Sequence, residues 1–140
     1  MEKLKFMNEA IRQAKKAFKK DEVPIGAVIV YKNKIISKAY NLKEKNQVAT
    51  RHAEIVAIEK ACKKKKSWRL DDCVLYTTLE PCLMCAGAII ESRIKKVICA
   101  AVKENECSLE IMRNNNIEVI IGVKEEDSLL LLKTFFTKKR

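Results

Sequence analysis

Two short segments of this chain carry side chains typical of metal sites, and they constrain the fold more than any other feature. His52-Ala53-Glu54 offers an imidazole nitrogen and a carboxylate, and Pro81-Cys82-Leu83-Met84-Cys85 offers two thiolates on one helical turn. Three protein ligands leave one position of a tetrahedral zinc ion open, which is the arrangement of a catalytic site. A water in that position becomes a nucleophile near neutral pH, and Glu54 can move its protons. The fold must therefore bring the two segments together.

The Cys-x-x-Cys pair alone also allows a redox motif or half of a structural zinc site. A redox motif usually follows the first strand of a thioredoxin-like unit, whereas this pair comes late in the chain. A structural site needs a fourth protein ligand. His52 is the only histidine, so another cysteine would have to supply that ligand. Cys62, Cys73 and Cys99 are expected to be small buried hydrophobic residues. Cys107 is expected to be structural.

The hydrophobic pattern predicts one α/β domain, residues 1–140, with no internal repeat or linker. Strands that alternate with helices indicate a layered sheet whose last two strands run parallel, because a helix between them allows a crossover. A hairpin is expected around Lys32-Asn33-Lys34. Strands are expected at residues 25–31, 35–40, 73–78, 97–102 and 117–123, and a first helix at residues 4–19.

Capping residues predict where the other helices begin. Thr50 is expected to cap a helix that ends at Lys63–Lys66, and Pro81 to occupy the first position of a helix over Cys82–Ser92. Ser108 is expected to cap a short helix through Met112, and Asp127 or Ser128 to open the last helix. Both groups of metal ligands then lie at helix N-termini, where the backbone N–H groups favour thiolate over thiol.

Composition indicates a soluble, cytoplasmic protein. No apolar stretch is long enough to cross a membrane, and the N-terminal residues lack the apolar region of a secretory signal. The formal net charge is +11, from 29 Lys and Arg against 18 Asp and Glu. Such an excess attracts polyanions such as nucleic acid. The alternative is that the lysines, including the run at Lys63–Lys66, are simply solvated surface.

The residues resemble a known family over nearly the whole chain. His-x-Glu followed by Pro-Cys-x-x-Cys resembles the signature of zinc-dependent nucleobase deaminases. Three further features resemble the tRNA adenosine deaminases that convert a wobble adenosine to inosine. They are Glu22-Val23-Pro24-Ile25-Gly26-Ala27, Leu79-Glu80-Pro81-Cys82, and a Phe135-Phe136 helix with a basic end.

The resemblance implies a three-layer cytidine-deaminase-like fold with a five-stranded mixed sheet flanked by helices. It also implies one Zn²⁺ per subunit on His52, Cys82 and Cys85, with a zinc-bound water as nucleophile and Glu54 as proton shuttle. Asn41 would hydrogen-bond the flipped base, and Ile25 would pack on the face of that base. The alternatives are that Asn41 is a turn residue that ends the hairpin and that Ile25 belongs to the core of its strand. The implied partners are a tRNA anticodon stem-loop and a second copy of the chain in a homodimer. The Phe135-Phe136 helix would lie near the RNA, or both rings would pack in the core.

Three features differ from the common family pattern. Val48-Ala49-Thr50-Arg51 replaces Asp-Pro-Thr-Ala and is more similar to the catalytic subunit of the eukaryotic heterodimeric enzymes. The segment from Val102 to Asn116 is shorter, and Lys103 stands where an acidic residue is common. These differences bear on which tRNA is recognised. The zinc motif itself leaves two alternative functions open: a deaminase of a free base or nucleotide such as guanine, cytosine or deoxycytidylate, and a non-catalytic, zinc-containing RNA-binding partner subunit.

Overall fold

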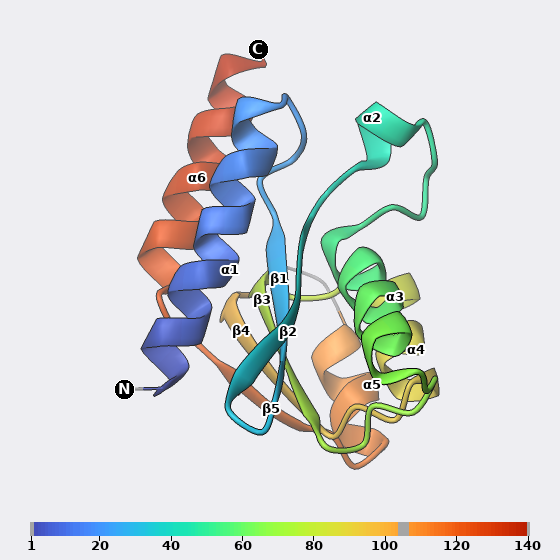
Figure 1. The fold of residues 1–140 in the computed structure, drawn as a ribbon. Helices are drawn as coiled ribbons and strands as arrows, with labels where there is room; N and C mark the ends of the chain where they lie inside the picture. The colour runs from blue at the N-terminus through green and yellow to red at the C-terminus, as the bar shows by residue number, and fades with distance from the viewer. Residues whose placement is uncertain (1, 104–106, 140) are drawn as a thin grey trace.

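A computed structural model describes residues 2–103 and 107–139 of the chain as one layered α/β domain (Figure 1). The sheet has five strands in the order β2-β1-β3-β4-β5. β1 is antiparallel to β2 and β3, whereas β3, β4 and β5 are mutually parallel, which confirms the predicted mixed sheet. The strands are β1 (Gly26–Tyr31), β2 (Lys34–Tyr40), β3 (Cys73–Leu79), β4 (Lys96–Ala101) and β5 (Glu118–Ile121).

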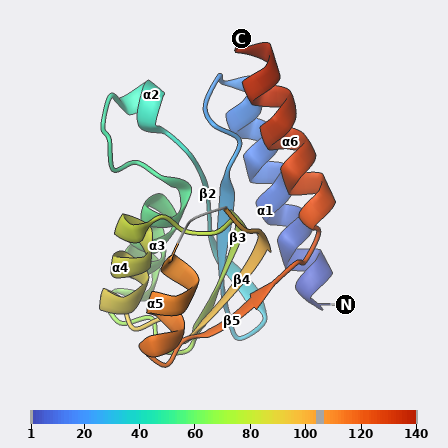
Figure 2. The ribbon, with the colours of Figure 1, turned by 180° about the vertical axis from the view of Figure 1, so that it is seen from behind.

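Helices cover both faces of the sheet and complete the three expected layers. Figures 1 and 2 show α1 and α6 side by side on one face, and α3, α4 and α5 on the other. The helices are α1 (Glu2–Lys19), α2 (Lys43–Asn46), α3 (Ala53–Lys65), α4 (Leu83–Glu91), α5 (Ser108–Asn114) and α6 (Glu125–Lys138). No helix in residues 2–103 and 107–139 is long and apolar enough to cross a membrane.

The N-terminal hairpin forms where the sequence predicts it. Lys32 and Asn33 both have positive φ, 49° and 62°, which is the conformation of a type I′ turn between two twisted strands. Gly26 opens β1 directly beneath α1, and a Cβ on it would lie only 2.0 Å from the carbonyl oxygen of Ala10. The residue at this position therefore has to be glycine for α1 to pack this closely on the sheet.

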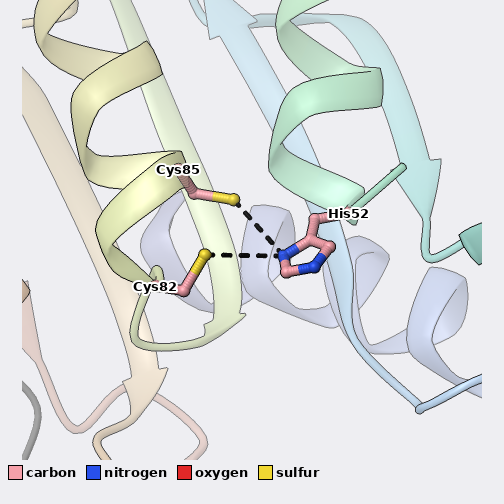
Figure 3. A group of neighbouring side chains, drawn as sticks. All are labelled: His52, Cys82 and Cys85. Carbon is pink, nitrogen blue, oxygen red and sulfur yellow. Dashed lines mark hydrogen bonds between the residues drawn. The ribbon is translucent and has the colours of Figure 1, made fainter. Parts of the chain in front are cut away.

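The parallel strands determine where a site can form. β3 leads into α4, and β4 leads through α5 to β5, so the carboxyl ends of β3 and β4 meet at one edge of the sheet. In α/β sheets this edge is where ligands usually bind, because the loops that follow the strands converge there. α4 begins at this edge, and the N-terminus of α3 faces the N-terminus of α4 (Figure 3).

The helix carrying the imidazole begins later than predicted, and the helix carrying the thiols has a different cap. The prediction that Thr50 caps α3 is wrong, because the N-cap residue is His52 and Thr50 lies in an exposed turn. The backbone N–H of Ala53 instead donates to the side-chain oxygen of Asn41, 2.8 Å away. Likewise Pro81 precedes the N-cap Cys82 of α4 and is not its first helical residue.

The two predicted hydroxyl caps near the C-terminus are also wrong, because tertiary contacts engage both hydroxyl groups. α5 has Cys107 as its N-cap, and the Ser108 hydroxyl donates to Glu80 at 2.9 Å. α6 begins at Glu125, before both predicted starts, and the Ser128 hydroxyl donates to the carbonyl oxygen of Thr78. β5 is shorter than the predicted strand, and α2 was not predicted.

Candidate metal centre

Two helix N-termini bring the predicted metal ligands together. His52 is the N-cap residue of α3, Cys82 is the N-cap residue of α4, and Cys85 lies in the first turn of α4. Figure 3 shows the imidazole ring pointing between the two sulfur atoms. His52 Nδ1 lies 3.6 Å from Cys82 Sγ and 3.6 Å from Cys85 Sγ. The two segments therefore meet as their spacing predicts.

The geometry of these three donor atoms fits zinc. With Zn–N of about 2.0–2.1 Å and Zn–S of about 2.3 Å, a tetrahedral site separates nitrogen from sulfur by about 3.6 Å. Both observed nitrogen–sulfur distances have this value. Among the described residues, the group of mutually close His, Cys, Asp and Glu donors contains only His52, Cys82 and Cys85. One imidazole and two thiols suit zinc, and a fourth position stays open to water.

The remaining cysteines lie outside this group of donors. Cys73 and Cys99 are buried, as predicted, whereas Cys62 is only partly buried and Cys107 is exposed. Cys73 packs into the core beside β1, and Cys99 lies in the centre of β4. None of the four joins the close group of metal donors, so the structure gives no fourth cysteine ligand among the described residues.

Glu54 lies in the first turn of α3 with only 3% of its surface exposed. Burial raises the pKa of Glu54 to about 7, and the positive charge of Lys103 and the nearby Cys85 thiol oppose this rise. A carboxyl group with this pKa can both accept and release a proton near neutral pH. Glu54 is thus buried and lies two residues after His52, one of the three candidate metal ligands.

The electrostatics of the ligands differ from the expectation that helix N-termini would favour thiolate. Burial raises the pKa of the Cys85 thiol well above its usual range, and the neighbouring Glu54 and Cys82 raise it further. Burial also lowers the pKa of His52, as do Lys103 and Lys43, which favours the neutral imidazole that a metal needs. A cation between these groups would reverse the effect on the thiol, because metal ligation deprotonates it.

Asn41 and Ile25, which the sequence singles out for base recognition, lie next to each other beside α3. The backbone N–H of Asn41 donates to the carbonyl oxygen of Ile25 at 3.2 Å. Asn41 is 6% exposed, and its Oδ1 is occupied by the N–H of Ala53. Ile25 is half-buried and packs against the core that contains α3. Their roles toward a substrate remain predictions.

Two functional carboxylates were not singled out in the sequence. Glu80 is 2% exposed and accepts the backbone N–H of Lys103 at 3.1 Å and the hydroxyl of Ser108. It thus holds Lys103 and the start of α5, and residues 104–106 between them lie outside the described residues. Glu22 holds α2 in a similar way. In the sequence, Glu22 stands two residues before Pro24 and Glu80 directly before Pro81. Both lie in segments that resemble the tRNA adenosine deaminases, which is the signal that could have drawn attention to them.

A hollow of about 650 Å³ lies at the C-terminal ends of α1 and α6. Lys20, Lys45 and Lys139 line it together with both rings of the Phe135-Phe136 pair. Phe135 is 7% exposed and stacks edge-on against Phe18, so it packs in the core, whereas Phe136 is 49% exposed. Core packing is therefore confirmed for Phe135 alone, and proximity of Phe136 to RNA stays a prediction.

Comparison with known proteins agrees with the site. The profile of the MafB19-like deaminase family matches residues 1–140. The tRNA-specific adenosine deaminase of Bacillus subtilis is 46% identical over 96% of this chain and 89% of its own length. A solved structure from work on A-to-I editing by tRNA:A34 deaminases superposes with a TM-score of 0.86, at 34% identity over 91% of this chain and 99% of that chain.

A guanine deaminase structure from Bacillus subtilis is also similar. It superposes with a TM-score of 0.67 at 42% identity, over 70% of this chain and 63% of that chain. The similarity to the tRNA-specific enzymes is more extensive, because it covers nearly all of both sequences. This chain therefore belongs to the MafB19-like deaminases and, within them, to the tRNA-specific adenosine deaminases.

Proposed function

We propose that this protein converts the wobble adenosine of a tRNA anticodon loop to inosine in a zinc-dependent reaction. The observation that carries the proposal is the convergence of one imidazole nitrogen and two sulfur atoms beside a buried carboxyl group. His52 Nδ1 lies 3.6 Å from both Cys82 Sγ and Cys85 Sγ. Glu54 follows His52 by two residues. The reaction is the addition of water at C6 of adenine and the loss of ammonia.

One Zn²⁺ on His52, Cys82 and Cys85 would lower the pKa of a water molecule and so supply a nucleophile near neutral pH. Glu54 takes a proton from the attacking water as the new C6–O bond forms. It delivers this proton to the ring nitrogen, then takes the second proton from the new hydroxyl group on C6 and delivers it to the amino group. The C6–N bond breaks, ammonia leaves, and the C6 hydroxyl becomes the carbonyl of inosine. Burial of Glu54 keeps this proton transfer away from bulk solvent.

Asn41 is proposed to hydrogen-bond the flipped base, and Ile25 to pack on its face. The Asn41 side-chain oxygen already accepts the N–H of Ala53, so its NH₂ group is the part that remains for a ligand. Ring nitrogens of adenine are acceptors and suit this donor. The contact between Asn41 N–H and the Ile25 carbonyl holds the two residues next to each other.

The anticodon loop is proposed to bind across the end of the molecule that carries the 650 Å³ hollow. Lys20, Lys45 and Lys139 offer positive charge to phosphates, and the exposed ring of Phe136 offers a surface on which a base can stack. Asp21 and Glu44 also line the hollow, so the charge there is mixed. The net charge of +11 adds a general attraction to RNA.

A homodimer is proposed through the exposed face of α4. Leu83 is 61% exposed and Met84 36% exposed at the start of this helix. A further hollow of about 460 Å³, lined by Trp68 and Ala88, continues the apolar surface toward α3. We expect sedimentation to give a dimer mass for the wild type and for Leu130→Asp on α6. Leu83→Asp should give a monomer that still folds; a Leu83→Asp dimer of wild-type stability would contradict this interface.

A deaminase of free bases is the second candidate function, favoured by the similarity to the guanine deaminase structure. Parallel incubation with an anticodon stem-loop, free adenine, guanine, cytosine and deoxycytidylate separates the two. Chromatography of the products should show inosine in the stem-loop and negligible change in the small molecules. Faster conversion of any free base or nucleotide than of the stem-loop would overturn the tRNA assignment.

A further inference from the structure

Glu22 carries a buried carboxylate to which the proposed chemistry gives no role. Its side chain is 1% exposed and lies in the link between α1 and β1. Oε1 accepts the backbone N–H of Glu44 at 3.0 Å, and Oε2 accepts the backbone N–H of Lys45 at 2.7 Å. Both donors lie in α2, so one side chain joins two segments that are distant in the sequence.

α2 depends on this contact because it lacks a capping side chain of its own. Its N-cap residue is Leu42, which forms no side-chain cap. In most helices an oxygen of the N-cap side chain accepts the N–H of the second or third helical residue. Here these residues are Glu44 and Lys45, and Glu22 supplies the acceptor from elsewhere in the chain. A helix of one turn has little stability alone.

The segment fixed in this way adjoins both residues proposed to contact the base. Asn41 stands just before α2, and its N–H donates to the carbonyl oxygen of Ile25. Ile25 stands three residues after Glu22, whose own N–H donates to Ala17 at the end of α1 at 3.0 Å. Leu42 N–H donates to the carbonyl oxygen of Arg51 at 2.9 Å. Glu22 thus closes a ring of contacts around Asn41 and Ile25.

We propose that Glu22 is a positioning residue for base recognition. Its carboxylate holds α2 and thereby keeps Asn41 and Ile25 in the arrangement that receives the flipped adenine. This inference rests on the proposed function. A displacement of about 1 Å at a reacting group can reduce a rate by about a hundredfold, so a loose α2 lowers the chemical rate even when the RNA is fully bound.

The contact itself is tested without substrate by amide hydrogen exchange of the full chain. Glu22→Gln keeps the size of the side chain but replaces one acceptor oxygen with an NH₂ donor, which cannot accept a backbone N–H. The amides of Glu44 and Lys45 should exchange about tenfold faster in this variant. Glu118→Gln, on the exposed edge strand, is the matched control and should leave them unchanged. Equal exchange in Glu22→Gln and the control would overturn the proposal.

The link to Asn41 is tested by a double-mutant cycle in single-turnover deamination of an anticodon stem-loop. Glu22→Gln should lose about tenfold in rate when the stem-loop is saturating, with zinc content within twofold of wild type. Because Glu22 acts through Asn41 and Ile25, Glu22→Gln should slow the Asn41→Ala variant by clearly less than it slows the wild type. Multiplying losses would overturn the positioning role. A wild-type protein without activity would overturn the proposed function, and the exchange result would still decide whether the contact exists.

Discussion

The Glu54 side chain is both buried and close to the candidate metal ligands. The carboxyl group is enclosed by the start of α3, and burial raises its pKa to about 7. A proton shuttle has to accept a proton in one step and release it in the next, which requires that neither form is strongly preferred. Glu22 and Glu80 are buried as well, but each accepts hydrogen bonds from distant segments.

Glu54→Gln should abolish inosine formation and leave zinc in place. The amide keeps the shape of the side chain but cannot take up a proton, and general acid–base catalysis contributes about 10²–10⁴-fold to a rate. Elemental analysis should still find the wild-type zinc content. Glu118→Gln, on the exposed edge strand β5, serves as the control and should keep full activity. Loss of zinc together with activity would show that Glu54 has a structural role.

Cys85→Ser should lose the metal, whereas Cys107→Ser should keep it. Cys85 Sγ is one of three donor atoms around a common centre, while Cys107 is exposed and belongs to no such group. Zinc measured by mass spectrometry of the intact protein, together with inosine formation, should fall only in Cys85→Ser. Equal zinc content in both variants would mean that the ion binds elsewhere.

Residue type allowed the metal ligands to be predicted, but it could not reveal every residue that shapes the site. His52 is the single histidine and Cys82 and Cys85 form the single Cys-x-x-Cys pair, so these residues stood out as candidate ligands, and the family resemblance favoured a metal over a redox pair. Glu22 and Glu80 are among many acidic residues. What distinguishes them is that their carboxylates accept backbone N–H groups from distant segments, and only the folded chain places those donors beside them.

Among the elements, hydrophobic periodicity predicted most helices and strands, whereas the capping residues were predicted poorly. The turn at Lys32 and Asn33 and the strand at Cys73–Leu79 follow from local sequence. Thr50, Ser108 and Ser128 look like caps, but two of these hydroxyl groups bind partners in other elements. α2 was missed because a helix of one turn is too short to show a hydrophobic period.

The packing of α1 on β1 leads to a prediction about two glycines. Gly26→Ala should destabilise the protein by about 3 kcal/mol, because its Cβ would overlap the backbone of α1 at Ala10 and Ala14. In a Leu83→Asp background, where the proposed dimer is absent, Gly87→Ala should instead stabilise the protein by up to about 1 kcal/mol, because that glycine lies inside α4 with open space around it. Urea denaturation of each variant beside its parent protein measures the difference, and equal changes in stability would contradict the close approach of α1 to β1.

For the molecule as a whole, the order of the strands explains why segments far apart in the sequence form one site. β3 and β4 are parallel, so the loops that follow them lie at the same edge of the sheet. α3 packs against β1, β2 and α4, which brings its N-terminus to that edge. The sequence predicted parallel pairing of the last strands from the helix between them. It did not give the order of the strands, because that order depends on how the layers pack.

The excess of positive charge should make RNA binding depend on salt. Affinity for an anticodon stem-loop should fall about tenfold or more between about 50 and 200 mM salt, because cations on the protein displace counterions from the phosphates. Fluorescence anisotropy at several salt concentrations measures the slope. Lys45→Gln, in the hollow that contains Phe136, should reduce the slope, whereas Lys96→Gln, at the start of β4, should not. A flat response in the wild type would contradict electrostatic binding.

The decisive measurement is X-ray absorption at the zinc edge of the purified protein, combined with elemental analysis. We expect one zinc per chain, with one nitrogen and two sulfur neighbours from His52, Cys82 and Cys85 and one light-atom neighbour from solvent. Three sulfur neighbours, or a protein with zinc supplied during expression that binds none, would contradict a catalytic zinc site.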